Sequence, residues 1–82
     1  MYFRAKIKKE QVVHFIGLFR SIEDHIAFDR IEKPAEHIFE FFVPTEAKNR
    51  FIEIMDLFYH QNIILWYKER DIKESSFFQY KD

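Results

Sequence analysis

The sequence predicts a ferredoxin-like α+β sandwich, in which a four-stranded antiparallel sheet carries two helices on one face. Three observations predict this fold class. Segments with strand-like alternation and segments with helical spacing follow one another in the order β-α-β-β-α-β. The 82 residues include only one Gly and two Pro, which favours short connections. Eleven Phe residues allow a short chain to bury a large apolar area.

A strand and a helix open the pattern. In residues 2–8, Phe3, Ala5 and Ile7 alternate with other side chains, as in a strand with one buried face. Residues 10–22 then carry apolar side chains at helical spacing, which predicts an amphipathic helix. Its apolar stripe consists of Val12, Phe15, Ile16, Leu18, Phe19 and Ile22.

The middle of the chain predicts an antiparallel hairpin. Residues 24–32 form its first strand, and the alternation there leaves open which face is buried. The two faces are Ile26 with Phe28 and Ala27 with Ile31. Residues 33–36 form the connection, since Pro34 favours a turn. Residues 37–43 form the second strand of the hairpin.

A second helix and a fourth strand complete the fold. Thr45 is expected to cap the helix at its start, and Asn62 is a suitable residue to end it. The apolar stripe of this helix is Ala47, Phe51, Ile54, Met55 and Phe58. Residues 63–69 form the last strand. We therefore expect one domain over residues 1–70 and a C-terminal tail over residues 71–82.

The third strand carries large apolar groups on both of its faces. In this topology the first and third strands are central, so Phe39, Phe41 and Val43 face the helices. The other, open face of the sheet is aromatic and charged and needs a cover. The candidate interface residues are Tyr2, Arg4, Ile38, Glu40, Phe42 and Trp66 on the sheet, and Phe77, Phe78 and Tyr80 in the tail.

Two covers are available for the open face. One is the tail itself, and the other is the same face of a second chain in a twofold homodimer. The homodimer is the preferred prediction because opposite charges suit pairing between chains. The charges in question are Arg4 and Lys6 against Glu40 and Asp29.

Composition and charge exclude several classes of protein. The net charge is −1, which gives no general attraction to nucleic acid or to anionic membranes. The chain has no Cys, so disulfides, thiolate catalysis and thiolate metal sites are excluded. The first ten residues lack the apolar core of a signal peptide, and no apolar run is long enough to span a bilayer. We expect a cytoplasmic protein without a membrane partner.

No motif indicates an enzyme or a cofactor. The four histidines, His14, His25, His37 and His60, show no helical two-His spacing, so they are interpreted as surface or strand-end residues. A catalytic role for His25 beside Glu23 and Asp24 is the alternative. No catalytic residues, metal ligands or cofactors are assigned.

RNA binding is a further alternative. Aromatic and basic residues on an open ferredoxin-like sheet are how an RNA-recognition motif stacks bases. The third strand lacks the basic-Gly-aromatic opening of that motif, and it carries Glu36 and Glu40 where they would repel phosphate. We therefore expect no nucleic-acid partner.

Residues 14–44, HFIGLFRSIEDHIAFDRIEKPAEHIFEFFVP, resemble small uncharacterised bacterial domains with a ferredoxin-like, ACT-like fold. The shared pattern is a Phe- and Leu-rich helix, a short acidic loop, and a hairpin ending in Val-Pro. The resemblance implies binding of a small effector, often an amino acid, at a dimer interface. It supplies no site residues.

Taken together, these observations predict a non-catalytic interaction or regulatory domain that self-associates through its open sheet face. The alternatives are an ACT-like domain that binds a small-molecule effector such as an amino acid, and an RNA-binding module.

Overall fold

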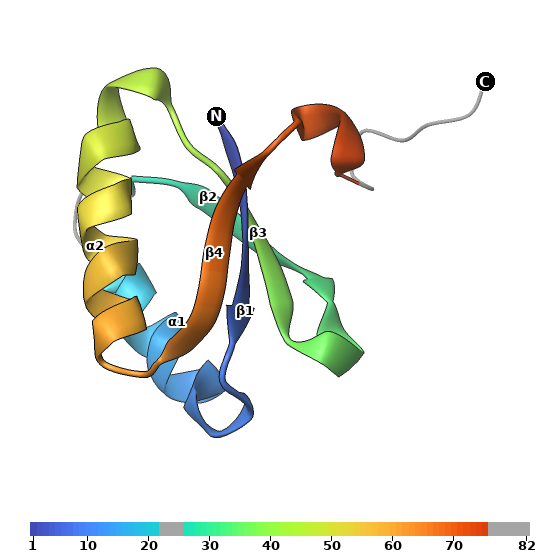
Figure 1. Cartoon of the computed structure of the whole chain (residues 1–82), viewed down its shortest axis with the longest axis vertical. Helices are drawn as coiled ribbons and strands as arrows, with labels where there is room; N and C mark the ends of the chain where they lie inside the picture. The colour runs from blue at the N-terminus through green and yellow to red at the C-terminus, as the bar shows by residue number, and fades with distance from the viewer. Residues whose placement is uncertain (22–25, 76–82) are drawn as a thin grey trace.

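The computed structural model describes residues 1–21 and 26–75, and it has the predicted order of elements (Figure 1). The strands and helices are β1 (Tyr2–Ile7), α1 (Val12–Arg20), β2 (Phe28–Lys33), β3 (Ile38–Phe42), α2 (Lys48–His60) and β4 (Ile64–Arg70). The strands form one antiparallel sheet in the order β2-β3-β1-β4. Both helices lie on the same side of this sheet, so the predicted ferredoxin-like α+β fold is confirmed.

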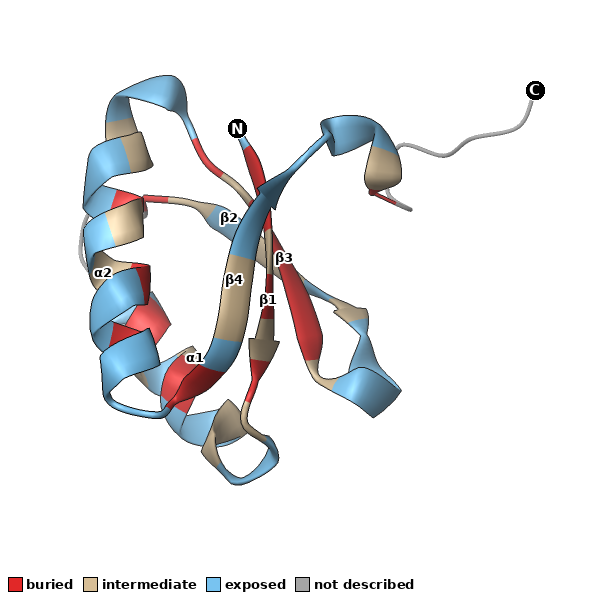
Figure 2. Cartoon of the chain, viewed as in Figure 1, coloured by how far each residue is buried: buried red, intermediate tan, exposed pale blue. Residues whose placement is uncertain are grey.

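The core lies between the sheet and the helices, and aromatic rings dominate it. Phe15 of α1 is fully buried, and its ring centroid lies within 5.5–6.1 Å of those of Phe39, Phe41 and Phe58. Burial is concentrated in the central strands β1 and β3 and on the inner faces of the helices (Figure 2). The predicted helical stripes are confirmed at Phe15, Phe19, Phe51, Met55 and Phe58, which are all buried.

The sequence predicted the C-terminal end of α2 correctly and its N-terminal cap wrongly. α2 ends at His60, and Asn62, the residue predicted to end it, follows in a left-handed conformation with φ of 62°. Its N–H donates to the carbonyl of Tyr59, and the N–H of Ile63 donates to that of Phe58, which together close the helix. The predicted cap at Thr45 is wrong. Thr45 is the first residue of a short 3₁₀ turn, residues 45–47, and α2 begins only after this turn.

The faces of β2 are resolved by where the strand begins. The strand starts at Phe28, so strand alternation does not extend back to Ile26. Ile26 is buried in the helix-side core, whereas Phe28 lies opposite Phe42 on the open face and is 58% exposed. Grouping these two residues on one face was therefore wrong. Ile31 lies opposite Phe39, on the helix side.

Candidate functional site

The open face of the sheet, opposite the helices, consists of three rows of side chains that run across the strands. The pairing register places Phe28, Phe42 and Tyr2 side by side, and we call these three residues the aromatic row. The next row, which we call the charged row, is Arg30, Glu40, Arg4 and Lys68. The third row contains Ile38, Lys6 and Trp66.

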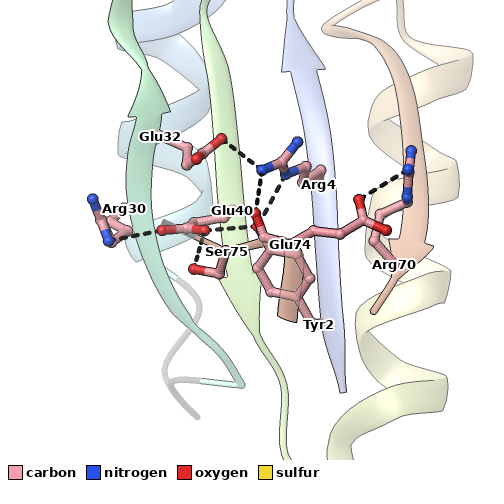
Figure 3. A network of polar contacts seen from close by, with 8 residues as sticks. All are labelled: Tyr2, Arg4, Arg30, Glu32, Glu40, Arg70, Glu74 and Ser75. Carbon is pink, nitrogen blue, oxygen red and sulfur yellow. Dashed lines mark hydrogen bonds and ion pairs between the residues drawn. The ribbon is translucent and has the colours of Figure 1, made fainter. Parts of the chain in front are cut away.

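Glu40 is the centre of the charged row and is fully buried (Figure 3). Its Oε1 accepts hydrogen bonds from the hydroxyl of Tyr2 at 2.7 Å and from the hydroxyl of Ser75 at 2.8 Å. Its Oε2 lies 3.0 Å from a guanidinium nitrogen of Arg30, as an ion pair without aligned hydrogen-bond geometry. A buried carboxylate is tolerated only when it is paired in this way.

Arg4 connects the charged row to the segment that follows β4. Its Nε donates to the Tyr2 hydroxyl at 2.9 Å, and its Nη2 lies 3.0 Å from Glu32 Oε1. The same nitrogen donates to the backbone carbonyl of Glu74 at 3.0 Å. The Glu74 side chain in turn pairs with Arg70 at 2.9 Å. These contacts hold the short 3₁₀ helix Ile72–Glu74 on the open face (Figure 3).

The environment of Tyr2 changes its acidity. Burial raises the pKa of the Tyr2 hydroxyl above its ordinary value, and the hydrogen bond from Arg4 opposes this shift. The hydrogen bond to Glu40 and the negative charge of that carboxylate raise the pKa further, so the net shift is upward. The hydroxyl therefore stays protonated and can donate to Glu40 at neutral pH.

The start of the predicted C-terminal tail lies against the folded domain. Ser75 is fully buried, and its contact with Glu40 joins residues that are 35 positions apart. Sequence reasoning missed Arg30, Glu32 and Ser75 as members of this network. Arg30 could have been found from the hairpin register, which sets it opposite Glu40. No periodic signal marks Ser75.

The candidate interface residues fall into three groups. Tyr2, Arg4 and Glu40 are joined to one another within one chain, and Ile38 is also buried. Phe42 and Trp66 lie on the same face and are partly exposed. Phe77, Phe78 and Tyr80 lie outside the described residues.

Three of the four charges expected to pair between two chains, Arg4, Glu40 and Asp29, have partners within one chain. Glu40 is enclosed by its own chain, so it could meet a second chain only if Ser75 moved away. Asp29 lies on the helix side of β2 and bonds to Arg20 at 3.0 Å. Arg4 and Asp29 therefore lie on opposite faces of the sheet. The prediction that both form ion pairs with a second chain through the open face is wrong.

The aromatic row ends at a shallow hollow of about 550 Å³ at the start of β2. Its lining residues are Arg20, Ala27, Phe28, Asp29, Phe42 and Pro44. The ring centroids of Phe28 and Phe42 are 5.8 Å apart, and those of Phe42 and Tyr2 are 5.4 Å apart. Phe28 thus forms the exposed end of the aromatic row, whose rings are tilted against one another and whose other end, Tyr2, is buried.

The remaining question is whether histidines and acidic residues form a metal site in the described structure. In residues 1–21 and 26–75, no three His, Cys, Asp or Glu side chains lie close enough together to hold a metal ion. His14 contacts the side chain of Gln11, and His60 contacts the carbonyl of Asp56. His25 lies outside the described residues. Neither described helix has the length and apolar character required to cross a bilayer.

Comparison with known proteins finds no matching family model, no matching curated protein and no matching solved structure.

Proposed function

We propose that this chain is a non-catalytic interaction domain that associates with a second copy of itself. The observation that carries the proposal is the exposure of Phe28, which is 58% accessible on an edge strand. Aromatic side chains are enriched at protein interfaces because they bury a large area with few rotatable bonds. The apolar atoms of Ala27, Phe42 and Pro44 around the hollow extend this surface.

Self-association suits the charges around Phe28. The rim of the hollow carries one cation, Arg20, and one anion, Asp29. A twofold interface brings the same patch of two chains together, so a patch with both signs can meet itself without like-charge repulsion. The open face contributes less than the sequence predicts, because residues 72–75 already cover part of it.

The test is the mass of the full chain in solution. Sedimentation velocity should show a shift from monomer to dimer between about 1 µM and about 1 mM. This is the range of dissociation constants expected for a small interface. Phe28→Ser should move this shift to higher concentration. The matched control is Val13→Ser, since Val13 is 85% exposed on α1. A chain that sediments as a monomer throughout contradicts the proposal.

The hollow also supports a second candidate function, binding of a free amino acid. Arg20 and Asp29 supply the two charges that a zwitterion needs, and Phe28 supplies an apolar wall. These two charges bond to each other at 3.0 Å, so a ligand would have to replace that contact. A thermal-shift panel of amino acids tests this function. Stabilisation that Arg20→Ala abolishes supports it, and an unchanged melting temperature across the panel contradicts it.

A further inference from the structure

The outer edge of β2 offers a specific surface for self-association. β2 lies at one end of the sheet, and no strand within residues 1–21 and 26–75 pairs with its outer edge. An open edge presents backbone N–H and C=O groups that can pair with another strand. The residues along this edge are Phe28, Asp29, Arg30, Ile31, Glu32 and Lys33.

We propose that β2 pairs antiparallel with β2 of a second copy, about a twofold axis through Ile31, and joins the two sheets into one. This inference rests on the proposed self-association and names its surface. In this register Ile31 meets Ile31, and Arg30 of each chain lies opposite Glu32 of the other. Opposite charges in directly facing positions stabilise an antiparallel pair.

The charge pattern of β2 selects this register over the others. In a twofold antiparallel pair one residue lies on the axis, because adjacent residues point to opposite faces. An axis through Asp29, Arg30, Glu32 or Lys33 would set two identical charges against each other, which destabilises the pair. An axis through Phe28, the first residue of β2, would set Asp29 and Arg30 against Ala27 and Ile26, which lie outside the strand. Ile31 is the one remaining residue of β2.

The structure of the monomer is compatible with this pairing. Ile31 is 41% exposed although it lies on the helix side, so its burial in a dimer would remove apolar surface from water. Arg30 and Glu32 already pair with Glu40 and Arg4 in their own chain. In this register the alternation of positive and negative charges on the open face therefore continues across the axis. Its advantage over the other registers is chiefly that no like charges face each other.

The bulge in β2 limits the length of the new ladder. The pairing of β2 with β3 shifts between Ile31 and Lys33, which places Lys33 opposite Ile38 on the open face. Asp29 lies on the helix side, so it would not contact Lys33 of the second copy. Bulges commonly weaken pairing at sheet edges. We therefore expect a weak dimer, with a dissociation constant on the order of micromolar or higher.

The other edge strand provides the control. Glu69 is the one acid of β4, and its basic neighbours Lys68 and Arg70 are adjacent to it in sequence. Adjacent residues point to opposite faces, so no twofold register of β4 sets Glu69 against either of them. Leu65 of β4 is 48% exposed, close to the exposure of Ile31.

The first experiment uses Ile31→Lys and Ile31→Glu, each alone and then mixed in equal amounts. Each variant alone should dimerise at least about tenfold more weakly than wild type, because identical charges meet on the axis. The mixture should recover association, because lysine then faces glutamate. The corresponding variants Leu65→Lys and Leu65→Glu should dimerise like wild type, alone and mixed.

The outcomes separate this inference from the proposed function. If wild type dimerises and both Ile31 variants dimerise equally well, the β2 surface is wrong while self-association stands. If the Ile31 variants dissociate but their mixture shows no recovery, the axis through Ile31 is wrong. If wild type is monomeric throughout, both proposals fail.

A second variant covers the case in which a charge at Ile31 prevents folding. The chain has no Cys, so Ile31→Cys introduces a single thiol. On a twofold axis the two thiols meet, and we expect a covalent dimer to form in a glutathione redox buffer. Leu65→Cys should remain monomeric under the same conditions. Equal yields of covalent dimer from the two variants would overturn the inference.

Discussion

The two faces of the sheet are stabilised in different ways. The helix side is an apolar layer in which Phe15, Phe39, Phe41 and Phe51 are almost fully buried. The open side buries the carboxylate of Glu40 beneath hydrogen bonds and an ion pair. Apolar packing is nondirectional and tolerates small shifts, whereas a buried charge requires every partner in place. The difference implies that the helix side determines stability and the open side fixes the path of the C-terminal segment.

The largest effect should come from the helix side. Phe15→Ala is expected to lower the free energy of unfolding by about 3–5 kcal/mol, because it leaves a cavity among the rings of Phe19, Phe39, Phe41 and Phe58. A domain of this kind has a total stability of roughly 5–15 kcal/mol, so the variant should be marginally folded. Urea denaturation followed by circular dichroism measures the change.

Val13, an exposed residue of the same helix, supplies the control for this prediction. Val13 is 85% exposed, so Val13→Ala should change the free energy of unfolding by no more than about 0.5 kcal/mol. Equal unfolding midpoints for the Phe15 and Val13 variants would show that aromatic packing does not dominate the helix side.

A smaller effect is expected from the open side. Glu40→Ala removes two hydrogen bonds and one ion pair, and we expect a loss of about 2–3 kcal/mol. The loss is limited because the side chain of Arg30 is 33% exposed and can be rehydrated. Trypsin should also cleave faster after Lys73, since the segment that contacts Glu40 opens more often. Denaturation and timed proteolysis measure the two effects.

An exposed glutamate is the control that separates the effect of burial on stability from the effect of removing a negative charge. Glu53 lies 3.9 Å from Arg50, and its side chain is 75% exposed. Glu53→Ala should therefore cost about 0–1 kcal/mol, and added salt should reduce even that. If Glu40→Ala costs no more than Glu53→Ala and leaves proteolysis unchanged, the network does not hold the C-terminal segment.

The contrast between the two faces of the sheet also explains which parts of the structure could be predicted from the sequence. Helical and strand periodicity depends on local spacing, so the helix-side core and the strand order were predictable from residues such as Phe15 and Phe41. The charged row depends on which strands pair and in which register. Once the hairpin register is known, Arg30 opposite Glu40 follows from it.

The role of Ser75 could not be predicted in the same way. It bonds to Glu40 from a segment with no regular periodicity, and that contact depends on the exact path of the chain after β4. Its consequence is that the open face is partly covered from within the chain. The tail was one of the two covers predicted for this face, and Glu74 and Ser75 at its start contact it. A second chain as the cover stays a prediction.

The smallest predicted effect concerns pH, and it should arise on the open side rather than in the apolar core. Burial raises the pKa of Tyr2, as does its contact with Glu40, although Arg4 opposes the shift. A tyrosine with a raised pKa stabilises the fold fully below its unfolded pKa of about 10, and this contribution is lost as the pH rises through the folded value. Wild type should therefore lose stability at alkaline pH, when the Tyr2 hydroxyl can no longer donate to Glu40.

Tyr2→Phe should remove this part of the alkaline dependence while keeping the ring in contact with Phe42. The absorbance of tyrosinate during an alkaline titration, together with urea denaturation at each pH, measures the effect. Tyr67 serves as the comparison, because burial and its hydrogen bond to Asp56 raise its pKa to about 12 outside the charged row. Tyr2→Phe should leave that late transition in place. If Tyr2→Phe and wild type lose stability identically between neutral and alkaline pH, the hydroxyl of Tyr2 does not couple proton binding to the open face.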